Sequence, residues 1–205
     1  MLRITATLLA FTLLLSAAPL AQMTPSGITL PIRLRAFAVN MSNIGGRGPG
    51  SAIVEVRITQ WSPAADRRML IDTMLAKGQD ALVRALEKLP AKGRMRFPNL
   101  QGPDPNNLRL GWDLRYTAQT PLPDGGARIV IALGRYMSFG ELTNQPRTVD
   151  YPFTLFEIRL GKDGKGEGKM AYATKIAFDK KNNNIELENY SSEPVRLTSI
   201  TSEKG

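Results

Sequence analysis

The chain has 205 residues, among them 27 basic and 18 acidic side chains but no histidine and no cysteine. The two missing residue types exclude the commonest general base, the thiol nucleophiles and the usual zinc, copper and haem ligands. The formal net charge of +9 affects solubility and the choice of partners. The length predicts one domain, large enough for its hydrophobic core to stabilise it without disulfides.

Residues 1–22 have the pattern of a signal peptide. Arg3 supplies the positive start, residues 4–15 the apolar run and residues 16–21 a region of mostly small side chains. The apolar run is too short to cross a bilayer as a helix. We therefore expect an exported protein, periplasmic or extracellular, in which residues 23–205 form a single β-rich domain without a further membrane span.

Alternation of apolar and polar side chains predicts strands along most of this domain, each with one buried face. Such runs occupy 28–39, 52–61, 93–97, 110–119, 127–137, 185–190 and 195–200.

A helical section interrupts the strands at about 63–89, where apolar residues recur with helical spacing. Ser62 is expected to cap its start, with Pro63 at the first helical position. Gly78 is expected to end a first helix and Pro90 a second. The pattern therefore predicts a pair of short helices inserted among the strands.

The strongest strand signal is a hairpin over 151–178. Two runs of strand-forming residues, 151–160 and 169–178, flank a turn that contains Asp163 and Gly164. Glycine tolerates the positive φ that tight hairpin turns need. Together, these elements predict an α+β fold that is mainly antiparallel β, with a sandwich or barrel-like sheet of about eight or nine strands and the inserted helices.

Two segments resemble a group of exported bacterial proteins: WSPAADRRML…GQDALVRALEKLP (61–90) and TPLPDGGARIVIALGRYMSFGELTNQPRTVDYPFTLFEIRLGKDGKGEGKMAYATKI (120–176). The similarity extends over nearly all of residues 23–205. That group has no assigned function, so the resemblance implies a single exported domain and brings no activity, cofactor or site residue.

Four aromatic side chains are candidates for a ligand-binding face. Trp112 and Tyr116 share one face of the predicted strand 110–119, and Phe156 and Tyr172 lie on apolar faces of the hairpin. In a barrel-like sheet such a face can surround an apolar ligand. Packing in the core is the alternative, because aromatic residues on the buried face of a strand usually have that role.

Glu141, Asp150 and Glu157 are the candidate carboxylates for a hydrolase. A glycosidase needs two acids at a set separation across a cleft. Glu157 alternates onto the polar face of its strand, which favours exposure, and Asp150 is typical of a turn. Because G-x-S-x-G, Walker and dinucleotide-binding motifs are also missing, we predict no catalytic residue, no metal and no cofactor.

The basic side chains are dispersed along strands and turns, whereas nucleic-acid-binding proteins gather them on one face with aromatic stacking positions. We therefore expect no nucleic-acid partner. The candidate partners are an anionic envelope component, such as lipid head groups or surface polysaccharide, an apolar small molecule, and another envelope protein.

The leading hypothesis is a non-catalytic binding or interaction module of the cell envelope. The alternatives are a carboxylate-dependent hydrolase of envelope or extracellular carbohydrate, and a carrier of a small apolar ligand in a β-barrel-like cavity.

Overall fold

The computed structural model describes seven ranges of the chain: 27–40, 50–98, 111–134, 154–172, 175–179, 184–188 and 195–204. The predicted signal peptide, residues 1–22, lies outside them.

Within these ranges the chain forms eleven strands and one helical element, α1 (Ala64–Lys88). The strands are β1 (Ile32–Asn40), β2 (Gly50–Ile58), β3 (Gly93–Arg96), β4 (Trp112–Leu114), β5 (Tyr116–Pro121), β6 (Ala127–Leu133), β7 (Thr154–Leu160), β8 (Lys165–Tyr172), β9 (Lys175–Asp179), β10 (Asn184–Glu188) and β11 (Val195–Lys204).

Nine of these strands form one sheet in the order β4-β3-β2-β1-β11-β8-β7-β6-β5. All of its neighbouring strands are antiparallel. The remaining two, β9 and β10, pair in a separate two-stranded sheet. The prediction of a mainly antiparallel β fold is confirmed, and the barrel-like architecture is the one present.

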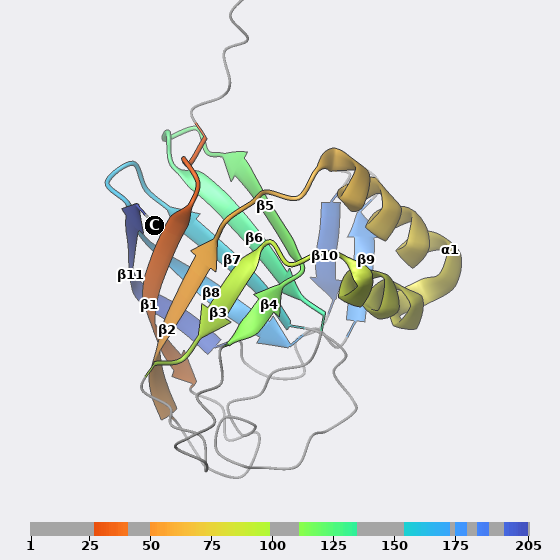
Figure 1. The fold of residues 1–205 in the computed structure, drawn as a ribbon, viewed down its shortest axis with the longest axis horizontal. Coiled ribbons are helices and arrows are strands. Elements are labelled where there is room, and N and C mark those ends of the chain that lie inside the picture. Colours follow the sequence, from red (N-terminus) through yellow and green to blue (C-terminus); the bar gives the residue numbers. More distant parts are fainter. Residues whose placement is uncertain are drawn as a thin grey trace, which may run out of the picture.

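The sheet is nearly closed because its two ends belong to neighbouring residues (Figure 1). β4 ends at Leu114 and β5 begins at Tyr116, although these strands are the first and the last in the sheet order. The residue between them, Arg115, donates its backbone N–H to the carbonyl of Ala132 on β6 at 2.9 Å. Since one residue spans only a few ångströms, the end of β4 and the start of β5 must adjoin, which brings the two ends of the sheet order together.

The linker between β2 and α1 forms hydrogen bonds with the outer edge of β5. Ser62 donates its N–H to the carbonyl of Thr117 at 2.8 Å, and its hydroxyl accepts the N–H of Thr117 at 3.1 Å. The Thr117 hydroxyl donates to the carbonyl of Gln60 at 2.7 Å, so this fully buried residue has partners for its polar groups. The prediction that Ser62 caps the helix is therefore wrong: its hydroxyl binds β5, and Pro63 occupies the N-cap position without a side-chain hydrogen bond.

Inward-facing side chains fill the barrel. On β1, for example, Leu34 and Ala36 are buried while Arg33 and Arg35 are exposed, as a period of two residues requires. The largest fully buried side chains of this core are Phe156, Leu34, Ile58, Met95, Leu114, Ile129, Ile131, Leu133, Ile158 and Met170. Each contributes about 1.5–3 kcal/mol of transfer free energy when it leaves water.

Helix α1 contains a sharp turn near its middle. Gly78 has φ 77° and ψ −174°, outside the helical region, and Figure 1 shows the element folding back on itself. A Cβ at Gly78 would have no atom within 4 Å, so the positive φ, and not lack of space, is what favours glycine. The predicted pair of short helices is not confirmed: α1 runs from Ala64 to Lys88, and the backbone leaves the helical conformation within it at Gly78. Among the described residues, no helix is both long and apolar enough to cross a membrane.

α1 packs on the outer face of β5, β6 and β7. The register places Tyr116, Ala132 and Leu155 side by side on these strands. They form a second core cluster with apolar residues in and just after the helix, among which Leu70, Leu82, Leu86 and Leu89 are buried. The helix therefore covers one side of the barrel, and the outer faces of β1, β2 and β3 are left without it (Figure 1).

Two predicted strands are interrupted. The run 169–178 is divided between β8 and β9, which belong to different sheets. The run 110–119 is divided at Arg115, after which the inward position passes to Thr117 instead of Tyr116. The single residue between β4 and β5 shifts the alternation by one position, which exchanges the two faces of the strand.

We expect Leu86→Ala to lower the free energy of unfolding by about 2–5 kcal/mol, because the removed side chain leaves a cavity between α1 and the barrel. Urea denaturation followed by circular dichroism measures the loss. The matched control is Leu75→Ala, on the same helix, whose side chain is 54% exposed and whose replacement is expected to change stability by less than about 0.5 kcal/mol. Equal losses in both variants would contradict this packing.

Candidate functional site at the barrel seam

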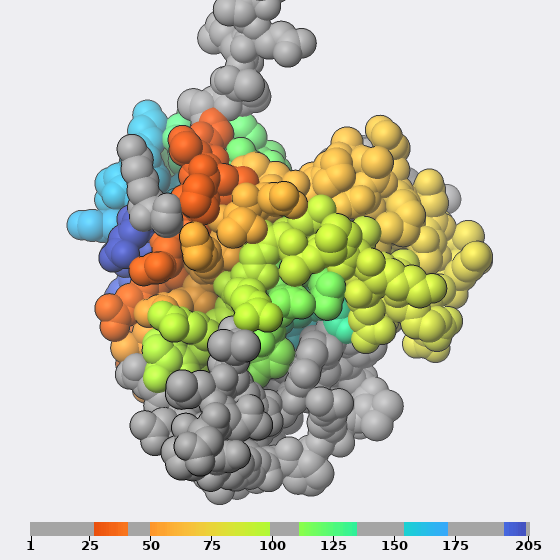
Figure 2. Space-filling view, viewed as in Figure 1, coloured from red at the N-terminus to blue at the C-terminus, as the bar shows by residue number. Residues whose placement is uncertain are grey.

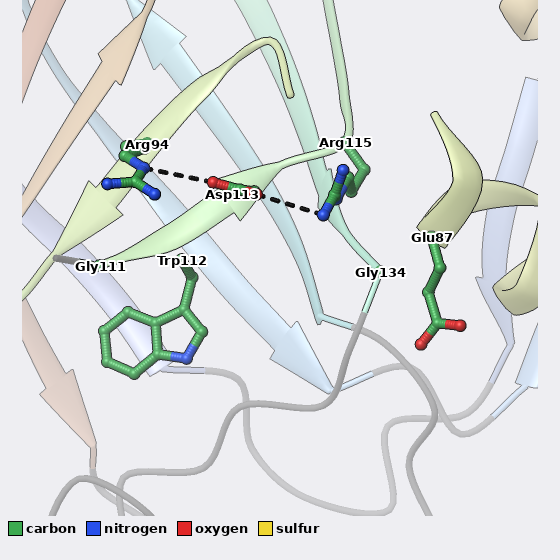
Figure 3. Close-up of a pocket in the computed structure, with 7 residues that line it drawn as sticks. All are labelled: Glu87, Arg94, Gly111, Trp112, Asp113, Arg115 and Gly134. Atoms are coloured by element: carbon green, nitrogen blue, oxygen red, sulfur yellow. Dashed lines mark hydrogen bonds and ion pairs between the residues drawn. The ribbon is translucent and has the colours of Figure 1, made fainter. Parts of the chain in front are cut away.

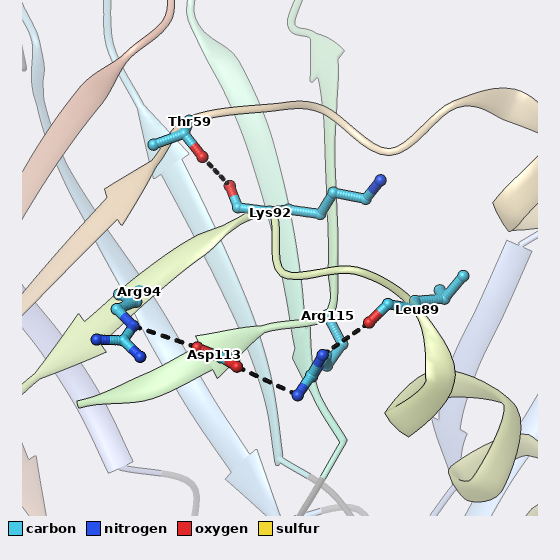
Figure 4. A network of polar contacts seen from close by, with 6 residues as sticks. All are labelled: Thr59, Leu89, Lys92, Arg94, Asp113 and Arg115. Carbon is cyan, nitrogen blue, oxygen red and sulfur yellow. Dashed lines mark hydrogen bonds and ion pairs between the residues drawn. The ribbon is translucent and has the colours of Figure 1, made fainter. Parts of the chain in front are cut away.

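Lys92, the residue before β3, connects β2, β3 and β4 where the barrel closes. Its carbonyl accepts the N–H groups of Thr59 and Gln60, at 2.9 and 3.2 Å, and the Thr59 hydroxyl at 2.9 Å. Its own N–H donates to the carbonyl of Leu114 at 2.7 Å. These bonds fasten the end of β2 and the start of β3 to β4 (Figure 4).

The side chain of Lys92 connects the seam to the first turn of α1. Its Nζ lies 3.4 Å from Oδ2 of Asp66, and the two side chains are 7% and 19% exposed. Oδ2 has no hydrogen-bond partner among the described residues, so the contact is an ion pair without hydrogen-bond geometry. Removal of one partner from such a buried pair leaves an uncompensated charge, which is strongly destabilising.

Tyr116 lies under the same end of the helix. Burial raises the pKa of its phenol above the ordinary value of 10.0; the nearby Arg67 acts to lower that pKa and Asp66 acts to raise it. Burial is the largest of these effects, because a phenolate is poorly solvated between α1 and the sheet.

Asp113 on β4 bridges two arginines. Arg94 donates from Nε to Oδ1 at 3.2 Å, and Nη2 of Arg115 lies 3.2 Å from Oδ2. Arg115 also donates from Nη1 to the carbonyl of Leu89, at the C-cap of α1, at 2.8 Å (Figure 4). That carbonyl is one of the acceptors that a helix end leaves without an intrahelical partner. One guanidinium therefore joins the sheet to the end of the helix.

A pocket of about 400 Å³ opens beside this bridge (Figure 3). Its lining combines two basic and two acidic side chains with an indole and two glycines. These residues are Glu87, Arg94, Gly111, Trp112, Asp113, Arg115 and Gly134. The volume lies within the range of small-molecule sites, about 300–1,000 Å³.

Gly134, just after β6, sets how closely the helix approaches the pocket. A Cβ at this position would lie 2.9 Å from Cγ and 3.1 Å from Cα of Glu87. Only glycine lets the last turns of α1 come this near to the sheet without displacement, and this approach brings the Glu87 carboxylate to the pocket.

Next to the pocket, three arginines stand side by side on the outer face of the barrel. The register pairs Arg33 on β1 with Arg57 on β2, and Arg57 with Arg94 on β3. We call these three residues the arginine row. It continues to Asp113 on β4 at one end and to Glu203 on β11 at the other.

The arginine row is exposed and poorly compensated. Neighbouring strands lie about 4.8 Å apart, and like charges directly opposite each other destabilise a sheet. Arg94 has its ion pair with Asp113, but Arg33 and Arg57 form none with any residue that the structure describes. Figure 2 shows side chains of β1, β2 and β3 at the surface on the near side of the barrel, with α1 to their right.

The neighbouring row has the opposite character. There Glu55 on β2 lies between Arg35 and Arg96, and its Oε2 is 2.6 Å from Nη2 of Arg96. Charges therefore alternate in sign in this row, whereas the arginine row places three like charges in succession.

The aromatic residues that the sequence groups together do not share one face. Trp112 and Phe156 lie in the barrel core, where Trp112 packs edge-to-face on Phe97 with ring centroids 5.8 Å apart. Tyr116 is on the outer side, under α1, because the alternation shifts at Arg115. Tyr172 ends β8, and its side chain lies outside what the structure describes. Of the four, Trp112 is the one that lines the pocket.

The candidate carboxylates are separated from this site. Glu157 is on β7 and accepts the Nε–H of Arg128 at 2.8 Å, and its side chain is 43% exposed, as its alternation predicts. Glu141 and Asp150 lie outside the described residues. The acids that do line the pocket are Glu87 and Asp113, which are not among the carboxylates predicted from the sequence.

The sequence presents the basic residues as dispersed, and the arginine row appears only when the strands are paired. The local signal is the alternation in IRLR and GRMR, which places arginines at outward positions of β1 and β3. Within the described ranges, no group of three or more acidic side chains is placed to hold a metal ion.

No protein-family model matches this chain, and neither a curated protein nor a solved structure is significantly similar to it.

We expect Arg57→Gln to raise the free energy of unfolding by about 0.2–1 kcal/mol, because it removes the central charge of the arginine row and with it two repulsive neighbours. The gain should shrink as salt is added, since salt screens exposed charges. Urea denaturation at low and high ionic strength measures both effects.

Arg96→Gln, on β3 in the neighbouring row of the same face, is the matched control. It breaks the contact with Glu55 and is expected to lower stability by up to about 1 kcal/mol. A loss of stability in Arg57→Gln at low salt would show that the row is not repulsive.

Tyr116 gives a prediction for alkaline pH. Its pKa is raised in the folded state, so above about pH 10 the unfolded chain releases the phenolic proton more readily than the folded chain. The free energy of unfolding should therefore fall as pH rises through this range, and it should fall less in Tyr116→Phe. Denaturation of both proteins at pH 8 and pH 11 measures the difference, and parallel losses would contradict the burial of this phenol.

Proposed function

We propose that this chain is an exported, non-catalytic binding module of the cell envelope and that it binds an anionic envelope component through the arginine row. The observation that carries the proposal is the direct register of Arg33, Arg57 and Arg94 on an exposed sheet face. Export rests on the signal-peptide pattern of residues 1–22.

The row is suited to an anion because its repulsion is relieved when a partner supplies negative charge. Guanidinium groups present rigid pairs of N–H donors that match carboxylate and phosphate oxygens. Hydrogen bonds to charged groups contribute about 1.5–3 kcal/mol each, more than neutral ones. A partner that reaches two arginines at once therefore gains both charge compensation and orientation.

A carboxylate-dependent hydrolase of carbohydrate is the second candidate. It is favoured by one observation, the presence of Glu87 and Asp113 in the same pocket. Against it, both oxygens of Asp113 are engaged by arginines, which suits a structural carboxylate better than a nucleophile or a base. Loss of a carbohydrate-hydrolysing activity in Glu87→Gln, with the fold intact, would favour the hydrolase.

The carrier of an apolar ligand is supported less. Trp112 and Phe156 are more than nine-tenths buried among the side chains of the barrel core, and Tyr116 belongs to another cluster. This arrangement favours packing over an aromatic-lined cavity.

The test compares a double variant of the row with a control that has the same change of charge. Arg33→Gln/Arg57→Gln should weaken binding to an anionic envelope probe at least tenfold, because two charged contacts are lost. The probes are polygalacturonate, vesicles that contain phosphatidylglycerol, and an acidic protein, measured by calorimetry at several salt concentrations.

The control is Arg68→Gln/Arg84→Gln, which removes two exposed charges from α1 and is expected to change affinity by less than about twofold at moderate salt, where distant charges are screened. If both double variants weakened binding of the anionic probe equally, net charge alone would explain the effect, and a specific site at the arginine row would be contradicted. Absence of binding to all three probes would contradict the proposal itself.

A further inference from the structure

We infer that the anionic partner is an acidic polysaccharide, and that the arginine row and the pocket beside Asp113 form one continuous binding track for its chain. This inference rests on the proposed function and names the class of partner for the same surface. Four features of the outer face support it: the continuity of the row with the pocket, the mixed signs of its charges, one exposed aromatic residue, and the composition of the pocket.

The row leads into the pocket. Arg94 is the last arginine of the row and also lines the pocket, and Asp113, its partner on β4, does the same. A chain that crosses β1, β2 and β3 in the direction of the row therefore arrives at the pocket between β4 and the end of α1. The step from one strand to the next, about 4.8 Å, is comparable to the length of one sugar ring.

The acids on this face favour a polysaccharide over a membrane surface. Glu55, Asp113 and Glu203 lie among the arginines on β2, β4 and β11. An anionic bilayer presents negative charge across its whole surface and would repel these carboxylates. An acidic polysaccharide carries hydroxyl groups between its charges, and carboxylates accept hydrogen bonds from hydroxyls.

The exposed apolar residues also fit a sugar chain better than a bilayer. Phe37 is 44% exposed on the outer face of β1, two residues after Arg35 and opposite Ile53 on β2. An exposed aromatic face next to cations can stack on the apolar face of a sugar ring. Among the described residues, the other exposed large apolar side chains, Met69 and Leu75, lie on α1 and not on this face, so they add no membrane-inserting patch here.

The pocket has the donors and acceptors that an end group of such a chain requires. Arg94 and Arg115 provide N–H donors for a carboxylate, and Glu87 provides an acceptor for hydroxyls. Trp112 is among the lining residues and its ring packs in the barrel core, so its fluorescence is expected to report on a sugar bound in the pocket.

The experiment titrates galacturonate and its oligomers of increasing length into the protein while indole fluorescence is recorded. The chain contains two tryptophans, so Trp61→Phe serves as the background in which Trp112 is the sole reporter. We expect affinity to rise with oligomer length, because longer chains reach the row as well as the pocket, and we expect the Trp112 signal to change at every length.

Two substitutions separate the row from the pocket. Arg57→Gln should weaken the binding of long oligomers at least tenfold and leave the affinity for galacturonate itself unchanged. Glu87→Gln should weaken the binding of oligomers of every length and of galacturonate. Arg68→Gln, on α1, is the control for a single lost charge and is expected to change neither the affinity for long oligomers nor that for galacturonate. Thermal unfolding of each variant shows that it is folded before it is titrated.

The outcomes distinguish this inference from the proposed function. Binding to phosphatidylglycerol vesicles or to an acidic protein that Arg57→Gln abolishes, without binding of the oligomers, overturns the polysaccharide and leaves an anion-binding row. Binding of oligomers that is independent of length, or silent in Trp112 fluorescence, overturns the track. If no anionic probe shows a dependence on Arg57, both the inference and the proposed function are overturned.

Discussion

Much of this molecule depends on one covalent constraint, the single residue that joins the two end strands of the sheet. Because only Arg115 separates β4 from β5, the nine strands cannot lie open, and the sheet must curl until its edges meet. The same residue then makes three further contacts. Its N–H donates to Ala132, and its guanidinium lies against Asp113 and donates to the carbonyl of Leu89. Arg115 therefore closes the barrel, positions the end of the helix and forms part of the pocket wall.

Closure also divides the outer surface into two unlike parts. On β5, β6 and β7 the outward positions Tyr116, Ala132 and Leu155 are covered by α1. On β1, β2 and β3 the outward positions include the arginines of the arginine row, which face solvent. A buried apolar row and an exposed charged row thus lie on the same barrel, and the pocket lies at the border between them. This arrangement explains why one site combines apolar, basic and acidic side chains.

More of the fold than of the candidate site could be predicted from the sequence. Alternation along segments such as IRLRAFAV shows a strand with one buried face, and Gly78 marks the place where the helix kinks. The pattern over 110–118 continues without a visible break through Arg115, so the exchange of faces at that residue leaves no trace in the sequence. The pattern accordingly places Tyr116 on the same face as Trp112. The arginine row cannot be predicted from the pattern for a related reason, because Arg33, Arg57 and Arg94 become neighbours only through strand register, which no local pattern encodes.

The hydrogen bonds at Thr117 have a consequence for assembly. An unpaired edge strand is a template on which a second chain can add a strand. Here Ser62 occupies both the N–H and the carbonyl of Thr117, and the side chain of Gln119 accepts the N–H of Ile28 further along the same strand. At Thr117, therefore, β5 offers no free backbone group to an incoming strand. The linker that leads into α1 therefore also blocks strand addition at this point of the β5 edge.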